Sequence, residues 1–236
     1  MMDANLLFLG AIQLLLVLLS ATIHEAAHAR AAELLGDPTP RALGRVTLNP
    51  IAHLDFLGTV IVPAAVVALG LPVAFGWARP TPVVARNLRR PGWDSLRVTL
   101  AGPAANAAFA LVAALALTIV VHVLGPEARQ AAQLSLLGGT IRDPAAPVLA
   151  VRGFPILFTL AQAAVINGFL VVFHLLPFPP LDGGMVLLQV VPPGWVPRLA
   201  ALRPYGFIIG AGLALSPLLW VLLIPFLVVL SVLINI

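Results

Sequence analysis

The chain has 236 residues, of which 61% are hydrophobic and 9% are charged, and its mean hydropathy is +1.06. Soluble globular domains carry about 25% charged residues, so this composition excludes that class and predicts a polytopic membrane protein. The net charge of +4 comes from thirteen arginines, with no lysine, against nine acidic residues, and because the arginines are dispersed between apolar segments they indicate membrane topology rather than nucleic-acid binding.

The first predicted element is an apolar helix from Asn5 to about Leu35, which ends before Gly36 and Pro38. At 1.5 Å per residue this helix would be about 46 Å long, and it therefore outspans the roughly 30 Å hydrocarbon core of a bilayer. Such a helix must tilt or protrude. The run HEAAH, residues 24–28, lies toward its C-terminal end, below the membrane surface but not at the midplane.

The HEAAH run predicts a metal site. Residues four apart on a helix lie on one face, so His24 and His28 could bind one Zn²⁺ while Glu25 faces a metal-bound water. The alternative is a pair of histidines that pack between helices, but ionisable groups inside a membrane segment are costly and usually mark function. Because the sequence has no cysteine, any further ligand must be His, Asp or Glu.

The two segments after the first helix are less regular. Residues 41–55 are polar and rich in turn residues, with a short β-like alternation, and we expect a loop or strand at the membrane surface. Residues 56–75 are apolar and long enough to cross a membrane, but Pro63, Gly70 and Pro72 interrupt them. This second segment therefore either crosses the membrane or dips into it and returns.

The arginines distinguish between these two topologies. If residues 56–75 crossed the membrane, the arginine cluster at 79–90 would lie on the opposite side from Arg41 and Arg45, which violates the positive-inside rule. We therefore expect a re-entrant segment, an N-terminus outside the cell and an active site near the cytoplasmic face. Irregular backbone at membrane depth is tolerated where it lines a water-filled cavity, which suits a hydrolytic site.

Three more long apolar elements are predicted: a helix from about Leu96 to Leu124, a span over residues 154–176 and a last span from about Tyr205 to Ile236. A mixed loop at 125–152 and the stretch LPFPPLDGG, residues 176–184, connect them, and a short helix follows to Val191. We thus expect one transmembrane domain over residues 1–236. Its fold class would be all-α, with about five transmembrane helices, a re-entrant segment and short β-like membrane-associated strands.

A third metal ligand must come from outside HEAAH, because a catalytic zinc site usually has three protein ligands and one open position. The candidates at a similar depth are Asp182, His174, His53 and Asp55. Asp182 is the strongest, since three prolines break the preceding helix and two glycines follow, so that its carboxylate lies on an irregular turn. The alternative is that Asp182 only caps the short helix after it.

The runs HEAAH, GRVTLNPIAHLDFLG, FGWARPTPV, AGPAAN and INGFLVVFHLLPFPPLDGG follow one another through nearly the whole chain. In these motifs and their order the sequence resembles the site-2 protease family of intramembrane zinc metalloproteases, and among them the small bacterial members without a PDZ or CBS domain. The resemblance implies that His24, His28 and Asp182 bind one zinc ion per chain and that Glu25 is the general base. It also implies hydrolysis of peptide bonds in transmembrane protein or peptide substrates by a multi-pass protein of the bacterial cytoplasmic membrane, in contact with membrane lipid.

One residue departs from the pattern of that family, in which F-N-L-L-P precedes the aspartate motif. The Asn is replaced here by His174, whose imidazole could contact the substrate or the oxyanion, bind the metal or serve in packing, and we predict the catalytic role. Asn106 and Asn167 are predicted to pack helices together. His53 and Asp55 are predicted to hold their loop near the site.

Two other functions compete with proteolysis. A catalytically inactive metal-binding membrane protein would keep the two histidines without needing Glu25 as a base. A transporter would need paired broken segments in two related halves of the chain, and the sequence has no such repeat. We therefore predict an intramembrane zinc metalloprotease, with no nucleic-acid partner.

Overall fold

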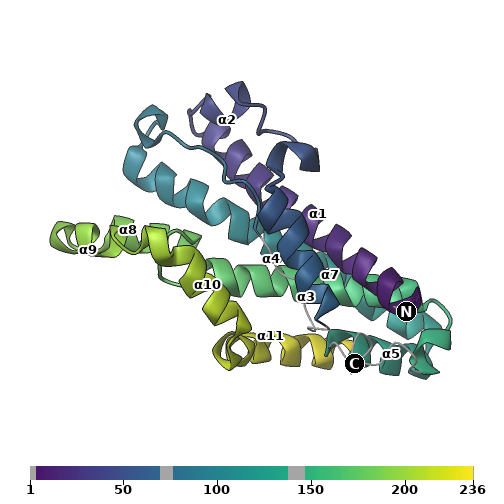
Figure 1. Ribbon diagram of the computed structural model, residues 1–236. Coiled ribbons are helices and arrows are strands. Elements are labelled where there is room, and N and C mark those ends of the chain that lie inside the picture. Colours follow the sequence, from purple (N-terminus) through teal and green to yellow (C-terminus); the bar gives the residue numbers. More distant parts are fainter. Residues whose placement is uncertain (1–3, 70–76, 138–146, 236) are drawn as a thin grey trace.

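Three long helices organise the fold (Figure 1). The computed structural model describes residues 4–69, 77–137 and 147–235, and in it the long helices are α1 (Ala4–Leu34), α4 (Pro91–Leu124) and α7 (Phe154–His174). Each contains a stretch that is long and apolar enough to cross a membrane. The three helices predicted in these parts of the sequence are therefore confirmed.

Shorter helices and helical turns connect and flank the long ones. In chain order they are α2 (Thr39–Ala42), the 3₁₀-helix η1 (Pro50–His53), the π-helix η2 (Phe56–Ile61), α3 (Val62–Ala68), η3 (Ala85–Asn87), α5 (Pro126–Leu136), η4 (Pro147–Ala150), α8 (Asp182–Val190), η5 (Pro193–Trp195), α9 (Val196–Ala200), η6 (Arg203–Tyr205), α10 (Gly206–Leu215) and α11 (Pro217–Asn235).

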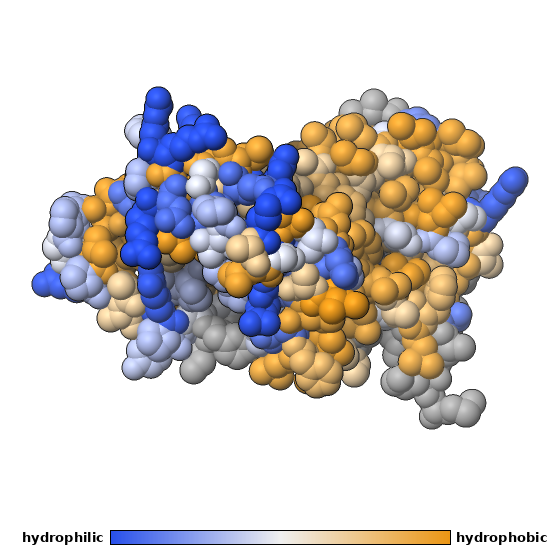
Figure 2. Space-filling model, turned by 90° about the horizontal axis from the view of Figure 1, so that it is seen from above, coloured by the Kyte–Doolittle hydropathy of each residue, from blue (hydrophilic) through white to orange (hydrophobic). Residues whose placement is uncertain are grey.

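The core lies around α7, which packs against α4, α5 and α1. Every residue from 161 to 170 is buried, as expected for an apolar helix in the middle of a bundle. Large apolar side chains on the outer side of α4, such as Leu111, Val112 and Ile119, are exposed. Figure 2 shows hydrophilic side chains gathered over one half of the visible face, the half with α2 and the start of α4, whereas the other half is mainly hydrophobic.

The β-like strands expected near residues 41–55 are not formed, because no residue in the described ranges adopts a strand. Local side-chain bonds account for the difference. The Asn49 side chain accepts the Ile51 N–H and caps η1, and the Asp55 side chain accepts the Gly58 N–H and caps η2. Such bonds between a side chain and the nearby backbone compete with strand pairing, so the alternation of polar and apolar residues here does not produce a strand.

The segment predicted to be re-entrant, residues 56–75, starts as the helices η2 and α3, and its end lies outside the described residues. The chain after this segment nevertheless lies beside its beginning. The Trp77 N–H donates to Gly58 O at 3.0 Å and the Thr59 hydroxyl donates to Trp77 O at 3.0 Å. A Cβ at position 58 would overlap the Trp77 ring, so only glycine permits this approach. A re-entrant segment requires such a return.

Two predictions for the second half of the chain were wrong. The last span is two helices, α10 and α11, which separate at extended Ser216 and at Pro217, because proline cannot supply the N–H that would continue the first helix. Part of the predicted loop at 125–152 is the helix α5, which buries Ala128, Ala131 and Ala132. Their spacing on one helix face explains why this segment packs against α7.

Candidate metal centre

His24 and His28 lie one turn apart on α1 and face α4, where both are nearly fully buried, with 4% and 8% of their surface exposed. His24 Nδ1 lies 2.6 Å from Asn106 Oδ1, and His28 Nδ1 lies 2.7 Å from Val98 O. Both oxygens can only accept, so each Nδ1 carries the hydrogen. In the neutral rings the lone pairs are then at Nε2, and the two Nε2 atoms are 3.0 Å apart.

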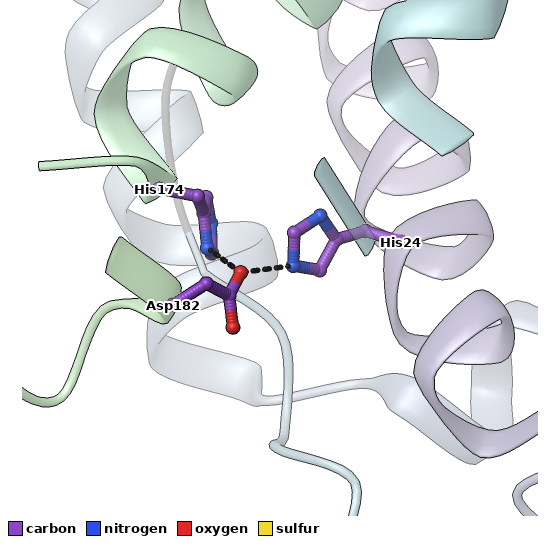
Figure 3. Close-up of side chains that lie close together, drawn as sticks. All are labelled: His24, His174 and Asp182. Carbon is purple, nitrogen blue, oxygen red and sulfur yellow. Dashed lines mark hydrogen bonds and ion pairs between the residues drawn. The ribbon is translucent and has the colours of Figure 1, made fainter. Parts of the chain in front are cut away.

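Asp182 reaches the two histidines from the first residue of α8. Its Oδ2 is 3.1 Å from His24 Nε2 and its Oδ1 is 3.5 Å from His28 Nε2 (Figure 3 draws the first of these pairs). The first turn of α8 packs closely against the preceding chain: a Cβ at Gly183 would overlap the backbone just after α7, and a Cβ at Gly184 would overlap the backbone of the turn at residues 178–179. The two glycines of the LDGG sequence therefore allow the carboxylate to reach the histidines.

These three residues fit a zinc ion. Zinc ligands lie 2.0–2.1 Å from the metal in a tetrahedral site, so neighbouring ligand atoms should be about 3.3–3.4 Å apart. The measured separations are 3.0, 3.1 and 3.5 Å. The Nε2 lone pairs of His24 and His28 and the Asp182 carboxylate are all acceptors, so they cannot hydrogen-bond to one another. A cation between them would bind all three. Gly102 on α4 keeps the space open, since a Cβ there would overlap Nε2 of both His24 and His28.

His174, the last residue of α7, also lies in this cluster. Its Nδ1 is 3.0 Å from Asp182 Oδ2, and its ring centroid is 4.2 Å from that of His24 (Figure 3). One ligand atom from each of His24, His174 and Asp182 lies within 4.8 Å of the others, so this trio is a second possible ligand set. We favour the set with His28, because acceptors at Nδ1 leave the Nε2 lone pairs of both HEAAH histidines facing Asp182, whereas His174 Nδ1 can carry the hydrogen that Asp182 Oδ2 accepts.

Glu25 is bonded to the extended segment 77–84, which passes over α1. Its Oε2 accepts the Thr81 N–H at 2.7 Å, and its backbone oxygen accepts the Thr81 hydroxyl at 3.1 Å. The carboxylate is thus fixed next to the histidines on the same helix. The sequence motif FGWARPTPV marks this segment, but it does not indicate the contact between Thr81 and Glu25.

A cavity of about 740 Å³ opens beside these residues. Its lining contains Glu25 and the cluster His24, His28, His174 and Asp182, together with mostly apolar side chains from segment 77–85, α4, α8, α9 and α10. A cavity of this size with a few convergent polar groups is typical of a ligand site. It would accommodate an apolar stretch of chain.

Loop residues support segment 77–84 from the side away from the cavity. His53 is buried, its Nε2 donates to Thr47 O at 3.0 Å, and its backbone oxygen accepts the Arg79 N–H at 2.9 Å. Asp55 caps η2, whose Gly58 contacts Trp77. The loop is held near the site in the way predicted for His53 and Asp55, although the two residues act separately.

Two buried residues beyond HEAAH tie the surrounding chain together. Asp37, just after α1, accepts hydrogen bonds from the Thr39 N–H and hydroxyl, from the Val84 N–H and from Asn87 Nδ2. Burial opposes the charge of this carboxylate, but the hydrogen bonds from Thr39, Asn87 and Val84 prevail and lower the pKa of Asp37. Arg45 donates to Ala52 O at 2.5 Å, and burial followed by the nearby charge of Arg79 lowers the pKa of its guanidinium.

Asn106 and Asn167, predicted to serve in helix packing, form part of a hydrogen-bond network behind His24. Asn106 contacts both His24 and Asn167, and Asn167 bonds the Ser20 hydroxyl. Ser20 and Thr81 were missed by sequence reasoning, since neither belongs to a motif with a recognised chemical role.

Comparison with known proteins identifies similar sequences. The model described as peptidase family M50 matches residues 12–193, which is more than half of the chain. The "Putative zinc metalloprotease YwhC" of Bacillus subtilis (strain 168) is 40% identical over 111 residues, which cover 47% of this chain and 47% of that protein. The match thus spans about half the length of this relative. No solved structure is significantly similar.

Proposed function

The chain belongs to peptidase family M50, the site-2 protease family, and from this premise we propose that it is an intramembrane zinc endopeptidase. Family membership and the similarity to a protein named as a putative zinc metalloprotease support metalloprotease activity. The observation that carries the proposal is the convergence of His24, His28 and Asp182 beside Glu25 at the wall of an apolar cavity.

His24 Nε2, His28 Nε2 and the Asp182 carboxylate are the proposed zinc ligands. Zinc bound there would act as a Lewis acid that polarises the scissile carbonyl and makes water more acidic. Glu25 is the proposed general base, which takes a proton from the attacking water and passes it to the leaving amide nitrogen. The bond from the Thr81 N–H occupies Oε2, so we assign this proton transfer to Oε1.

His174 has two proposed roles. Its Nδ1–H donates to Asp182 Oδ2, which supports a role in orienting the carboxylate ligand. The ring also lines the cavity, so its other edge is available to a substrate carbonyl, in the position where the family has Asn. Contact with the substrate remains the prediction from the sequence.

The proposed substrate is a transmembrane segment that unwinds locally beside segment 77–84. The N–H groups of Trp77, Arg79 and Thr81 all bond inward, to Gly58 O, His53 O and Glu25. In an extended chain the residues between them face the other way. Because Pro80 and Pro82 have no N–H, we propose that this outer edge offers mainly carbonyl oxygens to the amides of the substrate.

We propose that the protein is a multi-pass protein of the bacterial cytoplasmic membrane, surrounded by lipid. The three long apolar helices support membrane insertion. The contact between Trp77 and Gly58 supports a re-entrant segment, which would leave the arginine-bearing loops on the cytoplasmic side together with the active site.

The test uses purified chain in detergent with a panel of single-span membrane peptides. Wild type should contain about one zinc per chain, following the single site proposed, and cleave at least one peptide. Glu25→Gln should keep the zinc and lose cleavage, because it removes only the base. Asp182→Ala should lose both. Equal cleavage by wild type and Glu25→Gln would exclude the proposed mechanism, and full zinc content in Asp182→Ala would make His174 the third ligand.

A further inference from the structure

A network of buried side-chain amides extends from His24 into the core between the three long helices. Asn106 Oδ1 on α4 accepts from His24 Nδ1 at 2.6 Å, and Asn106 Nδ2 donates to Asn167 Oδ1 on α7 at 2.7 Å and to Ser20 O on α1 at 3.3 Å. Asn167 Nδ2 in turn donates to the Ser20 hydroxyl at 2.9 Å and to Ala163 O at 2.8 Å. Asn106, Asn167 and Ser20 are fully buried, with 0% of their surface exposed.

The network has only one consistent orientation. Both hydrogens of Asn106 Nδ2 are engaged, by Asn167 and by Ser20 O, so the oxygen of the same amide must face His24. An acceptor at that point requires a hydrogen on His24 Nδ1. The lone pair of the neutral ring is then at Nε2, which is the atom that faces Asp182.

The two HEAAH histidines are oriented by different means. His28 donates to a backbone carbonyl, Val98 O, which no substitution removes. His24 depends on a side chain, Asn106, whose own orientation depends on Asn167 and Ser20. A single substitution can therefore release His24 while leaving His28 in place.

We propose that Asn106 and Asn167 are positioning residues of the metal centre, which hold His24 in the tautomer and orientation that bind zinc. This inference rests on the proposed function, because it assumes that zinc binds at His24. Groups that hydrogen-bond to metal-binding histidines raise metal affinity by fixing the ring and its tautomer, and losing one typically weakens metal binding about 10- to 100-fold.

The test measures zinc affinity by competition with a chelator, on the purified full chain in detergent. Asn106→Leu removes the acceptor and should weaken zinc binding about 10- to 100-fold. It should also change the visible absorption spectrum of the Co²⁺-substituted protein, because the geometry at His24 is no longer fixed.

Gln162→Leu is the matched control. Gln162 is also a fully buried amide on α7, bonded to Gln13 on α1 at 2.8 Å and to Ser135 O at 2.6 Å. Its loss removes a buried polar contact between helices without touching His24, so the zinc affinity and the Co²⁺ spectrum should not change. An equal loss of affinity in this control would show that packing alone is responsible, and would overturn the proposal.

The remaining outcomes separate this inference from the proposed function. Wild type without zinc would overturn the proposed function. Wild type that binds zinc, together with unchanged affinity in Asn106→Leu, would overturn only the positioning role. If Asn106→Leu does not fold, Asn167→Ala is the deciding variant, because it removes the side chain that holds the far end of Asn106. Its zinc affinity should fall about 10-fold, the lower end of the same range. Unchanged zinc affinity in Asn167→Ala would also overturn the proposal.

Discussion

Gly102 illustrates how one absent methyl group keeps the proposed metal centre open. A Cβ at this position would overlap Nε2 of both His24 and His28, because α4 and α1 approach each other closely here. Glycine inside a helix is about 0.5–1 kcal/mol less favourable than alanine. The space it leaves for the two imidazoles is the physical reason for a glycine at this point of α4.

Gly102→Ala is therefore expected to displace the imidazoles and weaken zinc binding. Overpacking strain of about 1–3 kcal/mol corresponds to roughly a 5- to 150-fold loss of affinity. Gly92→Ala is the control on the same helix, since a Cβ there meets no atom within 4 Å, and it should leave zinc affinity unchanged. Wild-type affinity in Gly102→Ala, measured by chelator competition, would contradict this account of the site.

The three proposed ligands could be selected from local sequence patterns, and the structure brings them together. His24 and His28 were selected because four residues separate them on one helix, and Asp182 because its turn is unusual. The partners of these residues could not be identified. The bond from His24 to Asn106 joins residues 82 apart, and the bond from Thr81 to Glu25 joins residues 56 apart. Such contacts depend on how helices pack, which no local pattern reports.

At the scale of elements, segment 77–84 has no regular structure and is nevertheless fixed along its length. Its N–H groups bond to Gly58 O, His53 O, the Glu25 carboxylate and, at Val84, the Asp37 carboxylate. The segment therefore couples the loop after α1 to the proposed base. The sequence showed an arginine cluster and a motif in this region, but not that its backbone would be an integral part of the site.

Thr81→Pro tests whether the segment positions Glu25. Proline removes the N–H that donates to Oε2, and hydrogen bonds to charged groups contribute about 1.5–3 kcal/mol. The kcat should therefore fall about 10-fold or more at unchanged zinc content. Thr81→Val keeps the N–H and loses only the hydroxyl, so its kcat should stay closer to wild type. Equal kcat values for wild type and Thr81→Pro, measured on any cleaved peptide, would refute this role for the segment.

Asp37 anchors the far end of the segment and makes this anchor sensitive to acid. Because hydrogen bonds lower its pKa in the folded state, its contribution to stability is complete above the unfolded pKa of about 3.9 and is lost as the pH falls through the folded pKa. Asp37→Asn should be less stable at pH 7 by about 1–3 kcal/mol. The difference in melting temperature between wild type and variant should shrink as the pH is lowered from 7 to 3. A constant difference would contradict this stabilising role of the Asp37 carboxylate.

At the scale of the whole molecule, the arginine-bearing loops form one layer at the C-terminal end of α1. Arg45 is buried between them, and its guanidinium lies 2.5 Å from Ala52 O and 3.5 Å from Arg79 O. The loops at 41–55 and 77–90 therefore lie on the same side, where Figure 2 shows hydrophilic side chains gathered. This contact agrees with the charge pattern, whose assignment of both loops to the cytoplasmic side stays a prediction, whereas α5 and the break before α11 depend on short-range packing and on one proline.

Single-cysteine variants can test this topology, because the chain has no cysteine. Leu48→Cys and Arg86→Cys each place a cysteine in one of the two loops. Glu127→Cys places one at the start of α5, beyond the other end of α4. All three positions are exposed. In intact cells, an impermeant thiol reagent should label only Glu127→Cys. After the membrane is permeabilised, all three should react, and labelling of just one of the two loop variants in intact cells would rule out a shared side.

If the substrate pairs with segment 77–84 as proposed, the prolines of this segment have a consequence for substrate choice. An intact helix has no amide hydrogens to spare, because its own carbonyls already bind them. An edge that offers carbonyls and few N–H groups therefore favours a chain that has given up its helical bonds over one that has kept them. Selection of this kind depends on the backbone conformation of a segment rather than on its side chains. Helices that lose their backbone hydrogen bonds more easily would then be the better substrates.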